Sequence, residues 1–195
     1  MSSEKASPVR EKILEAAEMH VLEQGTSTLT LEAVAKAAEL SKGGLLYHFP
    51  NKDELIKGLV TRVYEHWMNC LQVAYGKEKP GKGHMARVLF RDTFEPELPL
   101  DSPKWKRHQR LVAALAAAIS HNPHLILCCR ESYQKFLTEF EKDELPLGNS
   151  LVMMCVYDAL WWSTVFGTYT LNDPQREALK KTLSQLLELQ PQSSL

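Results

Sequence analysis

Three helix starts crowd into the short stretch from Thr30 to Ile56. Thr30 precedes apolar residues at helical spacing and can N-cap a first helix. Ser41 can cap a second helix after a break that has room only for a turn. Pro50 ends that helix, because proline disfavours helical dihedrals in the residue before it. Asn51, with a glutamate three residues later, has the capping-box pattern of a third start. Two short helices joined by a tight turn are the layout of a helix-turn-helix, which suits a DNA groove and leaves little room for a catalytic cleft.

The residue types in this stretch fit contact with DNA. A helix presented by a preceding helix fits the major groove, with its N-terminal residues nearest the bases. Hydroxyls and open backbone N–H groups at the helix starts suit phosphate oxygens. Gly43 and Gly44 each cost the second helix roughly 1 kcal/mol relative to alanine, which close approach of the backbone to DNA would offset. An ordinary helical hairpin is the alternative. The side chains that add charge or donors on the same side are Lys42, Tyr47, His48 and Lys52.

The gap-free string LTLEAVAKAAELSKGGLLYHFPNKDEL (29–55) resembles the N-terminal domain of the TetR family of bacterial transcriptional repressors, and the resemblance covers residues 8–60. It implies an all-α fold of about nine helices, in which a three-helix DNA-binding domain with a helix-turn-helix precedes a helical domain for ligand binding and dimerisation. It also implies contact with phosphates or base edges by Thr30, Ser41, Lys42, Gly43, Tyr47, His48 and Lys52; Gly44 and Leu46 complete the candidate set.

Two positions depart from the family pattern. Glu39 stands at the turn, where a glycine is often found, which predicts a strained or differently shaped turn. Leu46 stands where a tyrosine is frequent and Tyr47 follows one residue later, so the ring is expected to approach a phosphate from another direction.

The charge of the chain is unusual for a nucleic-acid binder. The formal net charge is -1, and residues 1–60 carry seven Lys and Arg against nine Asp and Glu. The acidic residues gather on the first two helices, whereas Lys42 and Lys52 lie beside helix starts. We therefore expect modest non-specific affinity and a stronger reliance on shape, backbone donors and dimerisation.

The remainder of the chain has helical signals and no convincing strand. Ser7 and Pro8 form a capped start of a helix that Gly25 closes. The implied domains are a DNA-binding domain at 1–50 and a ligand-binding and dimerisation domain at 51–195, linked by the helix at 51–75. The other predicted helices cover 84–94, 104–120, 123–142, 147–168 and 173–189, with loops at 76–83 and 95–103.

The helix from 150 to 165 is apolar on every side, which predicts burial all round. One core could bury it, or its own domain could cover one face and a second copy another. The last helix has a parallel apolar face. The family resemblance implies a four-helix interface, so we expect a homodimer through about 150–168 and 174–189 that presents recognition helices to two half-sites. The apolar face of the last helix comprises Leu179, Leu183, Leu186 and Leu187.

A ligand site is predicted in the C-terminal part. Aromatic and methionine side chains suit a cavity for flat apolar compounds, although on helices they are more often ordinary core. Asp158 shifts the balance, because a carboxylate in an apolar helix needs a helix cap, a basic side chain, water or a cationic ligand. The segment VYDALW (156–161) resembles the multidrug-sensing branch of the family and implies a small aromatic or cationic effector. The candidate residues are Trp67 and Asp158, followed by Phe136, Met154, Tyr157 and Trp161.

Other chemistry finds little support. The four cysteines form no CxxC or Cys/His metal pattern, so we expect no metal and no cofactor. No nucleophile–base pair, glycine-rich phosphate loop or carboxylate pair stands out, which argues against an enzyme. The chain has no apolar run long enough to span a membrane and no N-terminal secretory segment, so a soluble, cytoplasmic bacterial protein is expected.

The leading hypothesis is a homodimeric repressor that binds double-stranded operator DNA and leaves it when a small ligand separates the C-terminal helices. The 51–75 helix would then swing, and the recognition helices would no longer match the half-site spacing. One alternative is a small-molecule-binding helical protein with weak or lost DNA binding. The adjacent Cys128 and Cys129 leave a cysteine-based, redox-responsive repressor as another.

Overall fold

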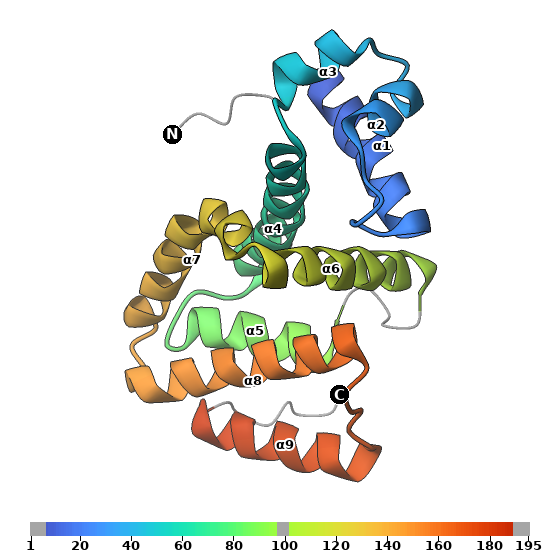
Figure 1. Cartoon of the computed structure of the whole chain (residues 1–195). Coiled ribbons are helices and arrows are strands. Elements are labelled where there is room, and N and C mark those ends of the chain that lie inside the picture. Colours follow the sequence, from blue (N-terminus) through green and yellow to red (C-terminus); the bar gives the residue numbers. More distant parts are fainter. Residues whose placement is uncertain (1–6, 97–101, 189–195) are drawn as a thin grey trace. The chain divides into compact units, whose positions relative to one another are not determined.

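The computed structural model describes residues 7–96 and 102–188, and every regular element in these ranges is helical (Figure 1). The predicted all-α fold is confirmed, with nine α-helices in the described ranges. None of the described helices combines the length and the apolar character that a membrane crossing requires. The helices are α1 Pro8–Gln24, α2 Leu31–Ala37, α3 Lys42–His48, α4 Lys52–Lys77, α5 His84–Phe94, α6 Pro103–His121, α7 Leu127–Glu139, α8 Leu147–Phe166 and α9 Asp173–Leu186, with short 3-10 helices η1 Pro123–Ile126 and η2 Phe140–Lys142.

The chain divides into two compact units. Unit 1 comprises Met1–His66 and Lys106–Glu131, and unit 2 comprises Trp67–Trp105 and Ser132–Leu195. The division passes through α4, α6 and α7, so each of these helices contributes one part to each unit. The compact unit that contains the helix-turn-helix therefore also contains chain from the middle of the sequence. The division at residues 50 and 51 stays a prediction about function.

Unit 1 holds its short helices by packing them on a common core. α2 and α3 have only seven residues each, and helices of this length are unstable alone in water. Buried side chains of α1, α2, α3 and α4 form one hydrophobic cluster, which side chains of α6 and the start of α7 complete. The members that are less than 2% exposed include Ile13, Leu14, Leu29, Leu45, Leu55 and Leu59.

The junction of α3 and α4 is closely packed. Phe49, which ends α3, is buried. A Cβ atom added at Gly58 would lie 2.8 Å from Phe49 Cε1 and 3.0 Å from Leu14 Cδ2. Glycine at position 58 therefore lets α4 approach both α1 and the end of α3, and this contact holds the recognition helix against the start of α4.

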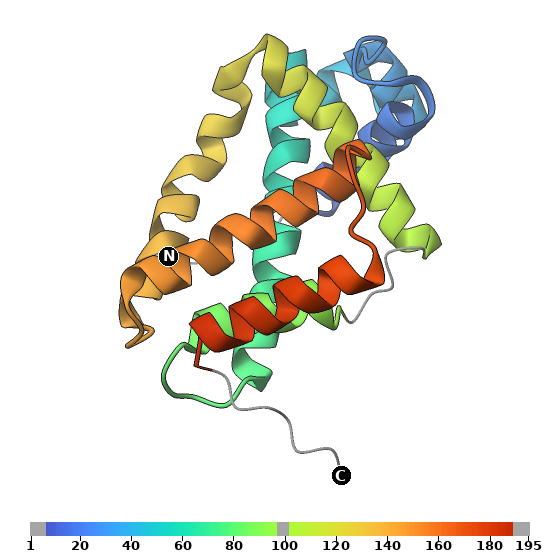
Figure 2. The same ribbon diagram turned by 90° about the horizontal axis from the view of Figure 1, so that it is seen from below.

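In unit 2, α5, α8 and α9 lie side by side (Figures 1 and 2). Leu183 of α9 and Leu187, which directly follows this helix, are buried in the unit's hydrophobic cluster, and Leu179 and Leu186 pack against it. The apolar face that the sequence predicts on α9 thus lies inside the protomer.

Within one chain, α8 is buried on one side only, so a single core does not bury it all round, whereas burial of its other side by a second copy stays a prediction. Met153 and Tyr157 are buried. Val152, Trp162 and Phe166 are 46%, 41% and 55% exposed. The exposed apolar side of α8 is therefore available to a second molecule.

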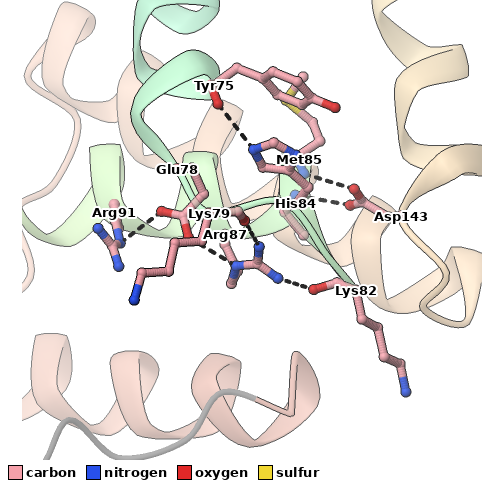
Figure 3. A network of polar contacts seen from close by, with 10 residues as sticks. Tyr75, Glu78, Lys79, Lys82, His84, Met85, Arg87, Arg91 and Asp143 are labelled. Atoms are coloured by element: carbon pink, nitrogen blue, oxygen red, sulfur yellow. Dashed lines mark hydrogen bonds and ion pairs between the residues drawn. The ribbon is translucent and has the colours of Figure 1, made fainter.

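Asp143 caps the N-terminus of α5 from a distant part of the chain (Figure 3). Its carboxylate accepts the N–H of Met85 at 2.7 Å and the N–H of Ala86 at 2.9 Å, and Ser150 Oγ donates to it at 3.3 Å. The N-cap residue, Gly83, has no side chain to do this and has φ 70°. A Cβ atom there would lie 2.7 Å from Leu145 Cδ1. Glycine therefore fits this position, and the distant aspartate provides the cap that glycine cannot.

A second polar cluster holds the loop between α4 and α5 (Figure 3). The buried Glu78 carboxylate pairs with Arg87 at 3.1 Å and with Arg91 at 3.0 Å. The His84 ring stacks on Tyr75 at 3.8 Å and its Nε2 lies 3.0 Å from the Tyr75 carbonyl oxygen. These contacts join the C-terminal end of α4 to α5.

Local signals predict most helix ends within a residue or two. Three details differ. Ser7 makes no side-chain cap, although its carbonyl accepts the N–H of Glu11 at 3.1 Å. Gly76 lies inside α4, so the loop starts later than predicted. The predicted 123–142 helix begins and ends as 3-10 turns. Part of the predicted loop at 95–103 and the predicted helix end at 189 lie outside the described residues.

Candidate DNA-reading surface and effector site

The two helix caps predicted in the helix-turn-helix are confirmed. The N–H of Ala33 donates to Thr30 Oγ1 at 3.2 Å, and the N–H of Gly44 donates to Ser41 Oγ at 3.1 Å. Both cap residues are exposed. A hydroxyl that accepts from the backbone still has its own O–H to donate, so both side chains keep a donor for a phosphate.

α3 presents an exposed aromatic group and an exposed glycine. Tyr47 is 86% exposed, and its ring meets the His48 ring edge-on at 5.1 Å. Leu46, in contrast, is half-buried. A Cβ atom added at Gly43 would meet nothing within 4 Å, whereas one at Gly44 would lie 3.3 Å from Ser41 Oγ. Packing within the protein therefore explains Gly44, through the cap, and leaves Gly43 without an internal reason.

The two lysines of the candidate set are engaged inside unit 1. Lys42 Nζ lies 2.5 Å from a carboxylate oxygen of Glu32 in α2. This hydrogen bond holds the pKa of Glu32 below its ordinary value. Lys52 Nζ donates to the carbonyl oxygen of Ser27 at 3.0 Å and so joins the start of α4 to the loop before α2. Contact of either lysine with DNA stays a prediction.

The turn of the helix-turn-helix has the unusual backbone shape that the glutamate at position 39 predicts. Glu39 has φ 55°, in the left-handed region that glycine adopts at less cost. Its carboxylate pairs with Lys12 of α1 at 2.9 Å. The ion pair ties the turn to α1.

Removal of the Glu32 charge is expected to raise the affinity for arbitrary DNA three- to tenfold. In Glu32→Gln, Lys42 loses its competing carboxylate and can neutralise one more phosphate. The slope of log affinity against log salt concentration should then become steeper by about 0.9. Fluorescence anisotropy on a random duplex at several salt concentrations measures both quantities. Glu23→Gln, at the exposed end of α1, is the control for net charge. Equal slopes in the wild type and Glu32→Gln would contradict this account.

Four aromatic side chains gather in unit 2 around Trp67 of α4. The indole stacks on Tyr133 of α7 at 5.9 Å and 20°, and meets Phe136 edge-on at 5.4 Å. Its Nε1 donates to Tyr157 OH at 3.0 Å, and that hydroxyl donates to Asp92 Oδ2 at 2.8 Å. Burial, together with the charge of Asp92, raises the pKa of Tyr157, so it stays a neutral donor. Phe140 extends the cluster from Phe136 at 5.2 Å.

Asp158 faces this cluster with one hydroxyl for a partner. Tyr133 OH donates to its Oδ2 at 2.9 Å. Among residues 7–96 and 102–188, no basic side chain forms an ion pair with Asp158. Burial raises the pKa of Asp158, and the hydrogen bond from Tyr133 opposes that rise. Among the described residues, the protein partner of this carboxylate is therefore a tyrosine hydroxyl and not one of the basic side chains that the sequence allowed.

The structure brings most of the predicted effector residues together. Met154 packs half-buried against the same hydrophobic cluster, whereas Trp161 meets the Trp162 ring edge-on at 4.8 Å. Sequence reasoning missed Tyr133 and Asp92. Tyr133 could have been found from its spacing to Phe136, because residues three apart lie on one face of a helix. No residue close to Asp92 in the sequence indicates its contact with Tyr157.

The cysteine pair lies in unit 1 at the start of α7. Cys128 is exposed and Cys129 is buried, with their sulfur atoms 3.7 Å apart. Thr61 of α4 donates to Cys128 Sγ at 3.3 Å. Burial raises the pKa of Cys129 to about 12, which disfavours the thiolate that disulfide chemistry needs. The described residues contain no group of three or more His, Cys, Asp or Glu side chains that could hold a metal ion.

Cys129 should therefore react with iodoacetamide at pH 8 more than a hundredfold more slowly than the exposed Cys70. The physical reason is the loss of thiolate, because each pH unit between the pKa and the solution lowers the thiolate fraction about tenfold. Timed alkylation followed by peptide mass spectrometry gives both rates in one sample. Similar rates at the two positions would show that Cys129 opens to solvent and would revive the redox hypothesis.

Comparison with known proteins agrees with this geometry. Residues 13–59 match the family described as bacterial regulatory proteins, tetR family, and residues 83–188 match the tetracyclin repressor-like C-terminal domain. The chain is 29% identical over 101 residues to the HTH-type transcriptional regulator TtgR of Pseudomonas putida, and 34% identical over 101 residues to the probable HTH-type transcriptional regulator ArpR of the same species. Each match covers 52% of this chain and 48% of the relative, so the chain spans about half the length of the curated relatives it matches.

Solved structures share the fold along most of the chain. Salmonella enterica GusR has a TM-score of 0.64 at 18% identity, covering 95% of this chain and 98% of that one. The multidrug binding protein EbrR complexed with ethidium has a TM-score of 0.63 at 19% identity, covering 92% of this chain and 98% of that one. At this level of identity the similarity concerns the fold.

The chain combines a capped helix-turn-helix with a second compact helical unit, an architecture typical of helical proteins that pair a DNA-binding domain with a second domain. Within that class, the two family matches show that the chain belongs to the TetR family. The relatives it matches are transcriptional regulators rather than enzymes.

Proposed function

We propose that this chain is a homodimeric transcriptional repressor that binds operator DNA and is released by a small aromatic or cationic ligand. The observation that carries the proposal is the surface of α3. Tyr47 is 86% exposed, and Gly43 is a helix-weakening residue with open space around it. Neither residue serves the fold of unit 1, and both suit contact with DNA.

The outer side of α8 supports dimerisation. Its exposed residues recur at alternating intervals of three and four, which is the spacing of a helix–helix seam. The outward side of α9 has the same rhythm with small or polar residues, because its leucines face its own protomer. The seam of α8 comprises Val152, Cys155, Ala159, Trp162 and Phe166, and that of α9 comprises Gln175, Ala178, Thr182 and Gln185.

The aromatic cluster and Asp158 support an aromatic, cationic effector. Ring faces attract planar cations, and a half-buried carboxylate without a basic partner favours a positive charge beside it. EbrR, a structure of the same fold, is described as a multidrug binding protein and has been solved with ethidium. The same ligand class is a reasonable choice for this chain because its own side chains offer the matching chemistry.

α4 is the element through which a ligand would act on DNA binding. Its first turn follows α3 directly, and its later part carries Trp67. A ligand that displaces Trp67 or its neighbours would bias the tilt of this helix, and a change of tilt in both protomers alters the distance between the two α3 helices.

One observation favours a second candidate, a ligand-binding helical protein with weak DNA binding. Lys42 and Lys12 are each paired with a carboxylate of unit 1, which leaves less positive charge for phosphates. The two candidates differ in their affinity for a specific sequence.

Selection of binding sites from random duplex DNA, followed by gel shift, tests the proposal. We expect a two-fold symmetric site, bound in the nanomolar range, with binding reduced at least tenfold by Tyr47→Ala. Ethidium should release the wild type more readily than Trp67→Ala, which also controls for intercalation of the dye into the probe. A reporter with the selected site across its promoter should be repressed. Failure to enrich any sequence would favour the second candidate.

A further inference from the structure

Tyr133 occupies a place that suits a planar cation. Its ring stacks on the Trp67 indole at a centroid distance of 5.9 Å and an angle of 20°, and its hydroxyl lies 2.9 Å from Asp158 Oδ2. One side chain thus covers the aromatic face and satisfies the carboxylate together. Stacking on an indole and pairing with an acid are the two contacts that a flat monocation would need.

A cation in the place of Tyr133 would interact more favourably with the negative charge of Asp158 than the tyrosine does. Tyr133 is a neutral donor, so it bonds to the carboxylate without cancelling its charge. Asp158 has no ion-pair partner in the parts of the chain that the structure describes. A bound cation would supply the positive charge that Asp158 lacks nearby. The hydroxyl of the displaced tyrosine can form its hydrogen bond with water instead.

The platform beneath Tyr133 does not depend on it. Trp67 Nε1 donates to Tyr157 OH at 3.0 Å, and Tyr157 is anchored on Asp92 at 2.8 Å. Phe136 supports the indole edge-on at 5.4 Å. These contacts therefore keep the indole in position after Tyr133 leaves.

We propose that Tyr133 is the built-in occupant of the effector site, and that a planar aromatic monocation binds by displacing its ring from between Trp67 and Asp158. This inference rests on the proposed function, because it concerns the same site. Tyr133 would then set the ligand concentration that the protein needs for a response, because its side chain competes with every ligand for the site. Compounds that cannot replace both of its contacts would not bind. Because Tyr133 belongs to α7, its displacement would also change the packing of that helix when a ligand is bound.

Ethidium binding to the full chain, measured by isothermal titration calorimetry without DNA, tests the inference. Tyr133→Phe keeps the ring and removes the bond to Asp158, and should bind ethidium about three- to tenfold more tightly than the wild type. Tyr133→Leu also removes the stacked ring and should bind at least tenfold more tightly. Phe94→Leu, which removes an aromatic ring that meets Phe90 at 4.9 Å in the same unit, is the control and should change the affinity less than twofold.

A double-variant comparison isolates the charge. Asp158→Asn should weaken ethidium binding at least tenfold, and Tyr133→Phe should give no gain when Asp158 is already asparagine. Unchanged or weaker binding by both Tyr133 variants, with Asp158→Asn still harmful, would overturn this inference while leaving the proposed effector site intact. If none of the proteins binds ethidium, the cationic ligand class of the proposed function fails, and the inference fails with it.

Discussion

Replacement of Asp143 by alanine is expected to lower the free energy of unfolding by about 3–5 kcal/mol. The carboxylate accepts the N–H groups of Met85 and Ala86 in a site where Asp143 itself is 2% exposed. Alanine leaves both donors buried without an acceptor, and Ser150 loses its bond as well. Each unsatisfied buried donor costs about 1–3 kcal/mol.

Urea unfolding followed by circular dichroism measures this loss. Asp143→Asn keeps one acceptor oxygen and should cost about half as much, because one of the two N–H bonds survives. Glu141→Ala removes a nearby exposed acid and should stay within about 0.5 kcal/mol of the wild type. Hydrogen exchange should show lost protection at the amides of Met85 and Ala86. An alanine variant within about 1 kcal/mol of the wild type would mean that the cap contributes little.

Replacement of Gly43 by alanine should change stability and DNA affinity in opposite directions. The new Cβ atom points into open space, so the helix gains propensity and unfolding becomes about 0.5–1 kcal/mol harder. On DNA the same methyl group would hold the backbone of the first turn away from the phosphates and base edges. We expect operator affinity to fall at least thirtyfold, or about 2 kcal/mol.

Gly76→Ala is the matched control, because Gly76 is also helical and open on every side. It should gain similar stability and leave operator affinity unchanged. Gly44→Ala differs from both, since its Cβ atom would lie 3.3 Å from Ser41 Oγ and would disturb the cap. Gel shift with the selected operator gives the affinities, and thermal unfolding gives the stabilities. Unchanged operator affinity in Gly43→Ala would remove the main argument that α3 approaches DNA through its backbone.

Much of the helix pattern follows from residues within a turn of each other. Pro8, Thr30, Ser41 and Pro50 predict helix ends that the structure reproduces, because a cap or a proline acts on the backbone immediately beside it. The unusual turn at Glu39 was predicted for the same reason, from a residue without glycine's freedom at a position that often needs it. The candidate DNA-contacting residues can likewise be predicted from the sequence, because they lie on these short helices and beside their caps.

The candidate effector site can be predicted from the sequence only in part. Residue type and the family resemblance together indicate Trp67, Phe136, Tyr157 and Asp158 as candidates, and Asp158 is conspicuous as a carboxylate in an apolar helix. The pairing of these candidates cannot be predicted in the same way. Tyr133 and Asp158 are 25 residues apart, and Trp67 and Tyr157 are 90 apart. No local preference connects such positions, so which side chain satisfies Asp158 depends on how α4, α7 and α8 pack.

The helices, the caps at Thr30 and Ser41 and the helix-turn-helix pattern can be predicted from the sequence alone, because each depends on interactions along a few consecutive residues. Which face of each helix is buried depends on how the helices pack together. The tertiary structure turned the leucines of α9 inward and left one side of α8 open, although both helices look apolar in the sequence. It also placed Asp143 beneath the start of α5, where it contacts Met85 across 58 residues of sequence. Burial and long-range hydrogen bonds depend on the sum of all packing contacts, which no single segment encodes.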